Sequence, residues 1–458
     1  MSKATLATIE QEFHTLCSAG KYAAAYQLAV RHRVPNVVIV DEREPLTLTS
    51  DKGTQGYRNW FDGPDDTMAR FVGRSVGILE ELAAESGNAF HLSRHGYAFV
   101  TARTDVREKL RAQARRLETF GAGPSREHPG PIPYAPVSGE RWEGVPDGAD
   151  LLLDPVLVRE HFAFVDESAI AVSHVRRAGW MDAIRLGRWL LDEACRRGAR
   201  IVRDRVTGID AEGGALRGVR LASGRNISTG RLAIAAGPGL PSVLDTIGIE
   251  LPVFLELHAK MRFEDRLEVV PRSAPFTIWS DPVDALDWSD AERVRFAADP
   301  HTRWLVEPFP GGLHVRPVGD GRDVFLIWTF ETSPHELVWP PSFDPHLGEV
   351  LLRGLAIMAP AARAYIGEGH RGIVDGGYYA KTPENRPVVG PLPIEGVYVT
   401  GALSGYGIMA AHAAAELLAA HMTCGSLPDY ADVLAPARYS DPDYRTRLEN
   451  WDAKAGQL

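Results

Sequence analysis

Two glycine-rich segments near the C-terminus offer the clearest chemistry in the chain. Residues 376–390 read GGYYAKTPENRPVVG, and residues 401–409 read GALSGYGIM. The composition predicts a turn-rich hairpin and then a strand that enters a helix, at about residues 408–422, through a glycine turn. Such a junction leaves backbone N–H groups at the positive end of a helix dipole, so we expect an electron-rich ligand to bind there.

An apolar run that ends in a carboxylate is the second chemical feature. Residues 37–40 read VVIV and are followed by Asp41. A run of this kind is typical of a strand buried on both faces of a parallel sheet. The acid that ends the second strand of a dinucleotide-binding fold accepts hydrogen bonds from the adenosine ribose. We expect this role for Asp41, and the alternative is a residue that simply starts a loop.

The phosphate-binding fingerprint that should precede Asp41 is missing. A buried strand and a G-x-G-x-x-G turn are expected about 20–25 residues upstream, but residues 16–21 read LCSAGK and contain one glycine, Gly20. Residues 11–15 make a poor buried strand, and side chains at the first two glycine positions obstruct a diphosphate. Either the diphosphate is held differently and more weakly, with charge from Lys21 in place of geometry, or this chain does not hold the nucleotide alone.

The elements that must position these residues follow from periodicity and turn signals. Residues 120–150 are rich in proline and glycine and predict an irregular surface excursion. Residues 255–370 hold five tryptophans, many prolines and strand-like pieces such as 324–330, which predict a mainly antiparallel second domain. Helical patterns cover 12–30, 66–85 and 182–197, and strands are expected at 95–101, 201–202, 206–209, 216–221 and 232–237.

The predicted fold class is therefore α/β (α+β), with a discontinuous Rossmann-like domain and an inserted, mainly antiparallel substrate or cap domain. The expected boundaries are 1–90, 150–250 and 370–458 for the first domain and 91–149 and 251–369 for the second.

Composition narrows the class of protein. A net charge of −10 over 458 residues argues against a nucleic-acid partner, and scattered arginines argue against a membrane-surface patch. The three cysteines, Cys17, Cys195 and Cys424, lack metal-ligand spacing, so we expect reduced thiols and no metal. No signal segment and no run of about 20 apolar residues is found. A cytoplasmic protein is expected.

These features together resemble the D-amino-acid oxidase and sarcosine oxidase superfamily of FAD enzymes. The resemblance rests on TPENRPVVG at 382–390, the glycine turn at 401–409, the strand ending in Ala-Ala-Gly at 235–237, and Asp41. It covers nearly the whole chain from Asp41 onward and is closest to sarcosine-oxidase-like proteins. It implies non-covalent FAD, because the cysteine that can tether flavin in monomeric sarcosine oxidase falls near Gly377.

The resemblance also implies where the cofactor is held. The helix start near Ile408 faces the pyrimidine edge of the flavin, where N–H groups stabilise the anionic reduced form. The backbone of Val206 meets the adenine, and the loop after Thr49 runs beside the flavin. The implied cofactor-binding residues are Asp41, Thr49, Ser50, Val206, Ala236, Gly237, Gly401, Ser404, Gly405, Tyr406, Gly407 and Ile408.

For the substrate, Arg58 matches an arginine that helps sarcosine oxidases bind the substrate carboxylate, a task suited to its two parallel donors. Tyr378, Tyr379 and Tyr406 are expected to line the pocket. His174, His258 and His314 are candidate polar groups there, with a structural role favoured for each.

Besides Gly377, three positions depart from the family pattern. The second carboxylate-binding residue, a lysine, falls on Met409, and the arginine of glycine and D-amino-acid oxidases falls near Tyr379. The lysine that activates oxygen falls near Leu326. Recognition of an amino-acid carboxylate and the choice between oxidase and dehydrogenase therefore stay open.

The function implied is that of an FAD-dependent oxidoreductase that oxidises a C–N bond of a small amine or N-substituted amino acid. Hydride transfer to flavin N5 gives an imine that water hydrolyses. The competing hypothesis, motivated by residues 16–21, is a flavin-free or weakly flavin-binding relative that acts as a binding or scaffold subunit. A homo-oligomer or a partner subunit is compatible with either.

Overall fold

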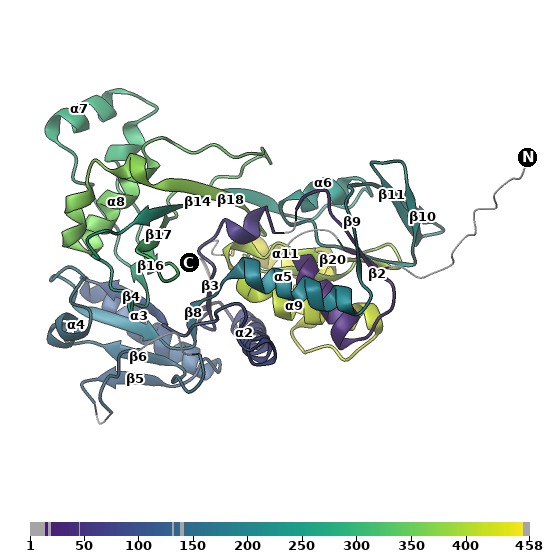
Figure 1. Ribbon diagram of the computed structural model, residues 1–458, viewed down its shortest axis with the longest axis horizontal. Coiled ribbons are helices and arrows are strands. Elements are labelled where there is room, and N and C mark those ends of the chain that lie inside the picture. Colours follow the sequence, from purple (N-terminus) through teal and green to yellow (C-terminus); the bar gives the residue numbers. More distant parts are fainter. Residues whose placement is uncertain (1–13, 17–19, 45, 131, 138–141, 452–458) are drawn as a thin grey trace, which may run out of the picture. The chain divides into compact units, whose positions relative to one another are not determined.

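The computed structural model describes residues 14–16, 20–44, 46–130, 132–137 and 142–451, with the backbone alone for 14–16 and 20. Its contacts divide the chain into two compact units (Figure 1). Of the described residues, unit 1 holds those within 14–48, 184–254 and 379–451, and unit 2 holds those within 49–183 and 255–378.

Unit 1 is built on a six-stranded sheet with the order β19-β20-β13-β1-β2-β9. Neighbouring strands are parallel except β19, which runs antiparallel to β20. The run at β2 is buried throughout, as the sequence predicts for a central parallel strand. The strands are β1 (His14–Leu16), β2 (Val37–Val40), β9 (Arg200–Val202), β13 (Arg231–Ile234), β19 (Val388–Pro391) and β20 (Val397–Gly401).

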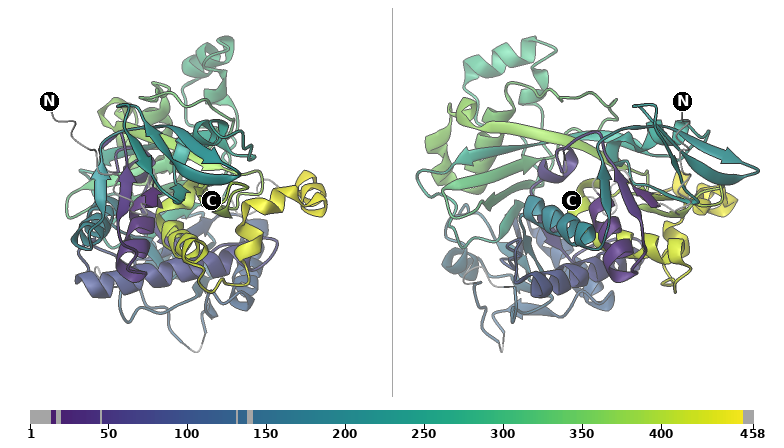
Figure 2. Two further views of the ribbon diagram at one scale, coloured as in Figure 1. Left: turned by 90° about the vertical axis from the view of Figure 1, so that its right-hand side faces the viewer. Right: turned by 45° about the vertical axis from the view of Figure 1, so that its right-hand side comes forward.

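Small side chains let two helices of unit 1 pack closely. α1 (Gly20–Tyr26) contacts α9 (Gly407–Thr423), and the alanines of both helices are buried. A separate antiparallel ribbon is formed by β10 (Val206–Glu212), β11 (Ala215–Leu221) and β12 (Asn226–Ser228), teal in Figure 2. The other helices are the π-turn Gln27–Arg31 that continues α1, α5 (Ala183–Arg196), α6 (Leu240–Asp245), α10 (Ala431–Leu434) and α11 (Pro442–Glu449).

Unit 2 is built on a nine-stranded, mainly antiparallel sheet with the order β18-β14-β17-β16-β15-β4-β7-β6-β5. A second, two-stranded sheet pairs β3 (Gly56–Arg58) with β8 (Ala178–Trp180). The nine strands are β4 (Tyr97–Thr101), β5 (Ser125–His128), β6 (Ala149–Leu152), β7 (Ala171–Val175), β14 (Phe254–Glu264), β15 (Phe276–Trp279), β16 (Leu313–Pro317), β17 (Asp323–Trp328) and β18 (Ile373–Lys381). The helices are α2 (Thr67–Ser86), α3 (Thr104–Thr119), α4 (Pro155–His161), α7 (Asp290–Ala298) and α8 (Leu347–Met358).

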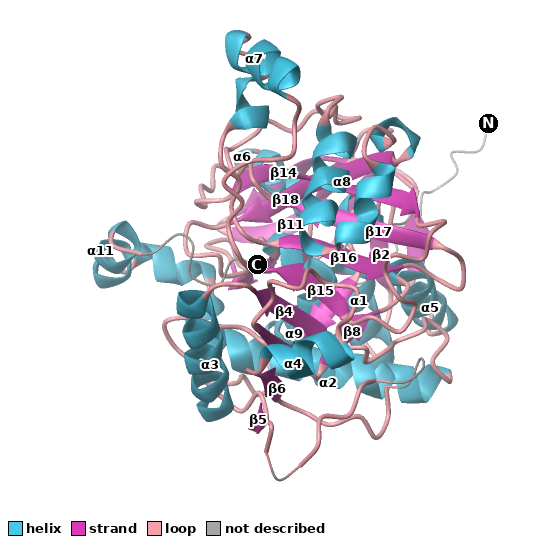
Figure 3. Ribbon diagram, turned by 90° about the vertical axis from the view of Figure 1, so that its left-hand side faces the viewer, coloured by secondary structure: helices cyan, strands magenta, loops and turns pink. Residues whose placement is uncertain are grey.

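The two faces of the large sheet differ in chemistry. Helix α8 lies over β17 and β16 on one face (Figure 3), where Met261, Val315 and Leu326 are buried in one apolar core with Leu351 and Leu355 of the helix. Side chains alternate along a strand, so the neighbours of these residues point to the opposite face. Those neighbours include the charged residues Lys260 and Arg316.

The structure confirms the predicted α/β class and the predicted helices at Thr67–Ser86, Ala183–Arg196 and Gly407–Thr423. Two expectations are wrong. Residues 12–30 are not one helix, because His14–Leu16 forms a strand that pairs with a neighbour on each side. Residues 120–150 contain β5 and β6 rather than only irregular chain. In both cases partners distant in sequence supply the ladder, so local composition carries no signal.

In the part of the chain that the structure describes, no helix is long and apolar enough to span a membrane.

Candidate functional site

The carboxyl ends of the parallel strands bring four predicted residues of unit 1 to one edge of its sheet. Asp41 follows β2, Ala236 and Gly237 follow β13, and Gly401 ends β20. The register of β1 with β2 and β13, and of β13 with β20, aligns these ends. Ligands of open α/β sheets bind at this edge, near the point where the strand order reverses.

The turn between β20 and α9 is held in an unusual backbone conformation. Ala402 and Ser404 have φ of 52° and 51°, in the left-handed region. The Ser404 hydroxyl donates to Oδ1 of Asn385 at 2.5 Å, and the Tyr406 hydroxyl donates to the Asn385 carbonyl. Tyr406 precedes α9 and offers no side-chain cap. The helix therefore begins with backbone N–H donors that a ligand can accept from.

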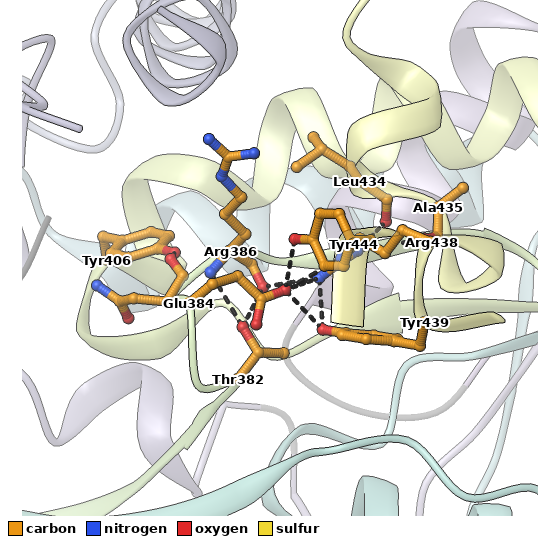
Figure 4. Close-up of polar contacts among 10 residues, drawn as sticks. Thr382, Glu384, Arg386, Tyr406, Leu434, Ala435, Arg438, Tyr439 and Tyr444 are labelled. Atoms are coloured by element: carbon orange, nitrogen blue, oxygen red, sulfur yellow. Dashed lines mark hydrogen bonds and ion pairs between the residues drawn. The ribbon is translucent and has the colours of Figure 1, made fainter. Parts of the chain in front are cut away.

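The hairpin that carries Asn385 is anchored by a buried charge cluster (Figure 4). Oε1 of Glu384 accepts from Nε and Nη2 of Arg438 at 3.0 and 2.9 Å, and the hydroxyls of Tyr439 and Tyr444 donate to the same oxygen at 2.8 and 3.0 Å. The side chains of Glu384 and Arg438 are 0% and 2% exposed. The motif TPENRP thus acts as a scaffold: its glutamate fixes the hairpin, and its asparagine fixes the start of α9.

The expected ribose acid is already engaged by nearby donors. Lys21, in the first turn of α1, forms an ion pair with Asp41, and the two side chains are 4% and 15% exposed. The Tyr22 hydroxyl donates to Oδ2 of Asp41 at 3.2 Å, and the N–H of Arg43 donates to Oδ1 at 3.1 Å. Residues 17–19 of the fingerprint segment lie outside the described residues. The ribose role of Asp41 stays a prediction.

In unit 2 the loop after Thr49 packs directly on β18. The Thr49 hydroxyl donates to the Tyr378 carbonyl at 2.9 Å, and Lys52 pairs with Asp375 at 2.8 Å. A Cβ on Gly377 would lie 3.2 Å from the Lys52 side chain, so glycine permits this close approach. Ser50 belongs to the same short 3-10 turn.

The predicted substrate residues are placed in different surroundings. Arg58 ends β3 and is buried; its Nε donates to the Trp60 carbonyl at 2.8 Å, and its guanidinium lies 5.4 Å from the Tyr97 ring. The hydroxyl of Tyr378 donates to the Val338 carbonyl at 2.9 Å. Tyr379 lies in unit 1, where its ring contacts the glycine turn. Burial raises the pKa of Tyr379 to about 12, so its hydroxyl stays protonated.

Comparison with known proteins decides the family. The model of the DAO family, described as FAD dependent oxidoreductase, matches residues 22–421. The chain belongs to this family of FAD-dependent oxidoreductases. The match confirms the predicted family, fold class and cofactor, and it begins just after the altered segment at residues 16–21. A search of curated protein sequences finds no match.

Solved structures share the fold of this family member at low sequence identity. L-proline dehydrogenase from P. horikoshii has a TM-score of 0.72 at 18% identity, covering 94% of this chain and 98% of that one. Glycine oxidase from Geobacillus kaustophilus has 0.70 at 13% identity, covering 92% and 97%. Iminodiacetate oxidase from Chelativorans sp. BNC1 has 0.68 at 17% identity, covering 93% and 99%.

The residues of unit 1 fit the FAD of the family at the glycine turn. An ideal Cβ on Gly405 would lie 2.9 Å from the Tyr379 ring, so the backbone can be approached closely only because this residue has no side chain. Together with the uncapped start of α9, this gives a cradle of N–H donors for an electron-rich ring edge. Lys21, which follows the altered segment 16–21, is paired with Asp41.

Replacing Gly405 by alanine is expected to weaken FAD binding about tenfold, because the added methyl forces the Tyr379 ring or the turn to shift. Fluorescence titration of the protein with FAD measures this. Gly230→Ala is the control, since Gly230 lies in unit 1 away from the turn and its Cβ would meet nothing within 4 Å. Equal affinities of the two variants would contradict the cradle.

Two buried cations of unit 2 were not found from the sequence. Lys260 lies on β14 opposite Ile327 of β17, and Arg316 lies on β16 opposite Phe325 of β17. Ile327 follows Leu326, the position near which the lysine of the family falls. Each is flanked by apolar residues of its strand. A charged residue at every second position of an otherwise apolar strand is the sequence pattern that could have revealed them.

The three candidate histidines all have partners within unit 2. His174 contacts the Tyr134 hydroxyl at 2.9 Å, and His258 contacts Glu256 at 2.9 Å, so both serve the structure. His314 contacts the Gly312 carbonyl through Nδ1, which must therefore carry the proton. Burial lowers the pKa of His314 to about 4, so the ring is neutral at pH 7 with Nε2 as the acceptor.

Proposed function

We propose that this enzyme oxidises the C–N bond of a small N-substituted amino acid, with Arg58 holding the substrate carboxylate. The observation that carries the proposal is a buried guanidinium whose direction is fixed by the Trp60 carbonyl at Nε and by a hydrogen bond with the Tyr97 side chain. Glycine, proline and iminodiacetate, the substrates in the names of the structural relatives, each combine a C–N bond with a carboxylate. A small amine without a carboxylate is the alternative substrate.

When bound, FAD supplies the acceptor for the two electrons that leave the C–N bond. The start of α9 in unit 1 presents backbone N–H groups and its dipole to negative charge. In unit 2, Arg58 orients the substrate by two parallel hydrogen bonds to its carboxylate. Nε2 of the neutral His314 accepts a hydrogen bond from the substrate amine. We also propose that Thr49, Ser50 and Val206 contact the FAD. Tyr378 is proposed to line the substrate pocket.

The diphosphate is proposed to be held by charge rather than by a glycine loop. Lys21 sits in the first turn of α1, and its ion pair with Asp41 fixes the ammonium there. We expect Lys21→Met to weaken FAD binding about tenfold, the loss of one charge-assisted contact to phosphate. FAD titration measures the effect, with the exposed Lys109→Met as control. An unchanged dissociation constant for Lys21→Met would reject this role.

Product analysis tests the proposed reaction. The FAD-loaded protein is incubated with N-methylglycine, N-ethylglycine, glycine and methylamine, and the carbonyl product and released amine are quantified. The proposal predicts equal amounts of carbonyl product and amine from at least one N-substituted amino acid, and less from methylamine. If methylamine is the only compound oxidised, the proposed role of Arg58 in binding a substrate carboxylate is rejected. If no compound gives product, the proposed reaction is rejected.

A further inference from the structure

One face of the large sheet of unit 2 gathers two buried cations around one aromatic ring. Lys260 pairs with Ile327 of β17 and Arg316 pairs with Phe325 of the same strand, so all four point to the same face. The Lys260 ammonium and the Arg316 guanidinium lie 5.1 and 4.8 Å from the Phe325 ring. These two cations are 4% and 3% exposed.

Backbone carbonyls, rather than carboxylates, hold these cations. Lys260 donates to the Asp51 carbonyl at 2.7 Å, and Arg316 donates to the carbonyls of Thr54 and Pro317 at 2.7 Å each. Within the described part of the chain neither forms an ion pair.

The nearby acids face another lysine. Asp51 and Asp375 both pair with Lys52, at 3.5 and 2.8 Å. Asp51 and Asp375 act on Lys260, and Asp182 acts on Arg316, through space and without an ion pair. Burial outweighs these acids, and it lowers the pKa of Lys260 to about 8 and that of Arg316 to about 9. A bound anion would supply the missing charge.

Arg58 lies at the end of the segment whose carbonyls hold the two cations. Residues 51–58 contribute the carbonyls of Asp51 and Thr54 and then Arg58 itself. The charge of Arg58 helps to lower the pKa of His314, which lies two residues before Arg316 on β16. One substrate carboxylate takes both parallel donors of the Arg58 guanidinium. Arg316 and Lys260 then remain for a second anionic group of the substrate.

We propose that Arg316 and Lys260 bind a second carboxylate, so that the substrate is a dicarboxylic N-substituted amino acid. This inference rests on the proposed function, in which Arg58 takes the first carboxylate. A counter-ion belonging to the protein's own cofactor is the competing explanation, and it predicts no preference among small acids.

Calorimetric titration of the FAD-loaded protein with acetate and succinate, neither of which has a C–N bond, tests the proposal without turnover. Succinate is expected to bind at least about tenfold more tightly than acetate. Arg316→Met and, separately, Lys260→Met should abolish this preference and leave acetate binding unchanged. Arg262→Met is the matched control, because Arg262 lies on the same strand as Lys260 and pairs with Asp323 at the surface; it should keep the preference.

Equal binding of acetate and succinate by the unmodified protein would overturn the inference, as would a preference that survives in both Arg316→Met and Lys260→Met. Circular dichroism confirms that each variant is folded, and a misfolded Arg316→Met leaves the decision to Lys260→Met. Turnover of N-methylglycine without a preference for dicarboxylates would reject the second site alone. A succinate preference in a protein that turns over no C–N substrate would reject the proposed function instead.

Discussion

Replacing Arg438 by methionine is expected to lower the free energy of unfolding by about 3–5 kcal/mol. The substitution leaves the Glu384 carboxylate fully buried without a cation, with only the hydroxyls of Tyr439 and Tyr444 as donors. Because Glu384 anchors the hairpin that holds Asn385, the same variant should also bind FAD more weakly. Urea denaturation measures the first effect and FAD titration the second.

Two further variants make this prediction sharp. Arg445→Met changes an exposed arginine of α11 and should shift stability by no more than about 0.5 kcal/mol. Glu384→Gln combined with Arg438→Met removes both buried charges and should recover part of the loss. A loss below about 1 kcal/mol for Arg438→Met would show that the cluster is not the anchor of the hairpin.

Replacing Arg58 by lysine is expected to reduce kcat/KM for a carboxylate substrate roughly a hundredfold. Lysine keeps the charge but loses the two parallel donors, and hydrogen bonds between charged groups contribute about 1.5–3 kcal/mol each. The loss should appear mainly as a higher KM. Steady-state kinetics with an N-substituted amino acid measures it.

A substrate without a carboxylate is the internal control for Arg58→Lys. Its kcat/KM should be nearly the same in the variant and in the unmodified enzyme, since Arg58 has no carboxylate to hold. Loss of activity on both substrates would point to a structural role for Arg58 through its bond to the Trp60 carbonyl. Unchanged kinetics on the carboxylate substrate would reject the assignment.

The sequence was sufficient to predict the edge of the unit 1 sheet. Each element there carries a local signal: an apolar run before Asp41, small residues after β13, and glycines before α9. Parallel pairing then brings these ends together without any further information. The helix of residues 407–423 was predicted within a residue for the same reason.

The sequence was not sufficient where long-range pairing decides. The three residues His14–Leu16 are too short a run to predict a strand, and they are held by ladders to β2 and β13. Lys260 and Arg316 lie 56 residues apart and share a face only through the register of the intervening strand β17. Their burial without ion pairs depends on carbonyls of residues 51–54, which no local pattern reveals.

The visible spectrum of the protein as isolated tests the central claim, that this family member still holds FAD despite the altered segment at 16–21. The account predicts yellow protein with an absorbance band at about 450 nm, as for any oxidised flavin cofactor, which bleaches when an N-substituted amino acid is added without oxygen. Colourless protein that gains no visible band with excess FAD would contradict it and leave the flavin-free subunit as the better explanation.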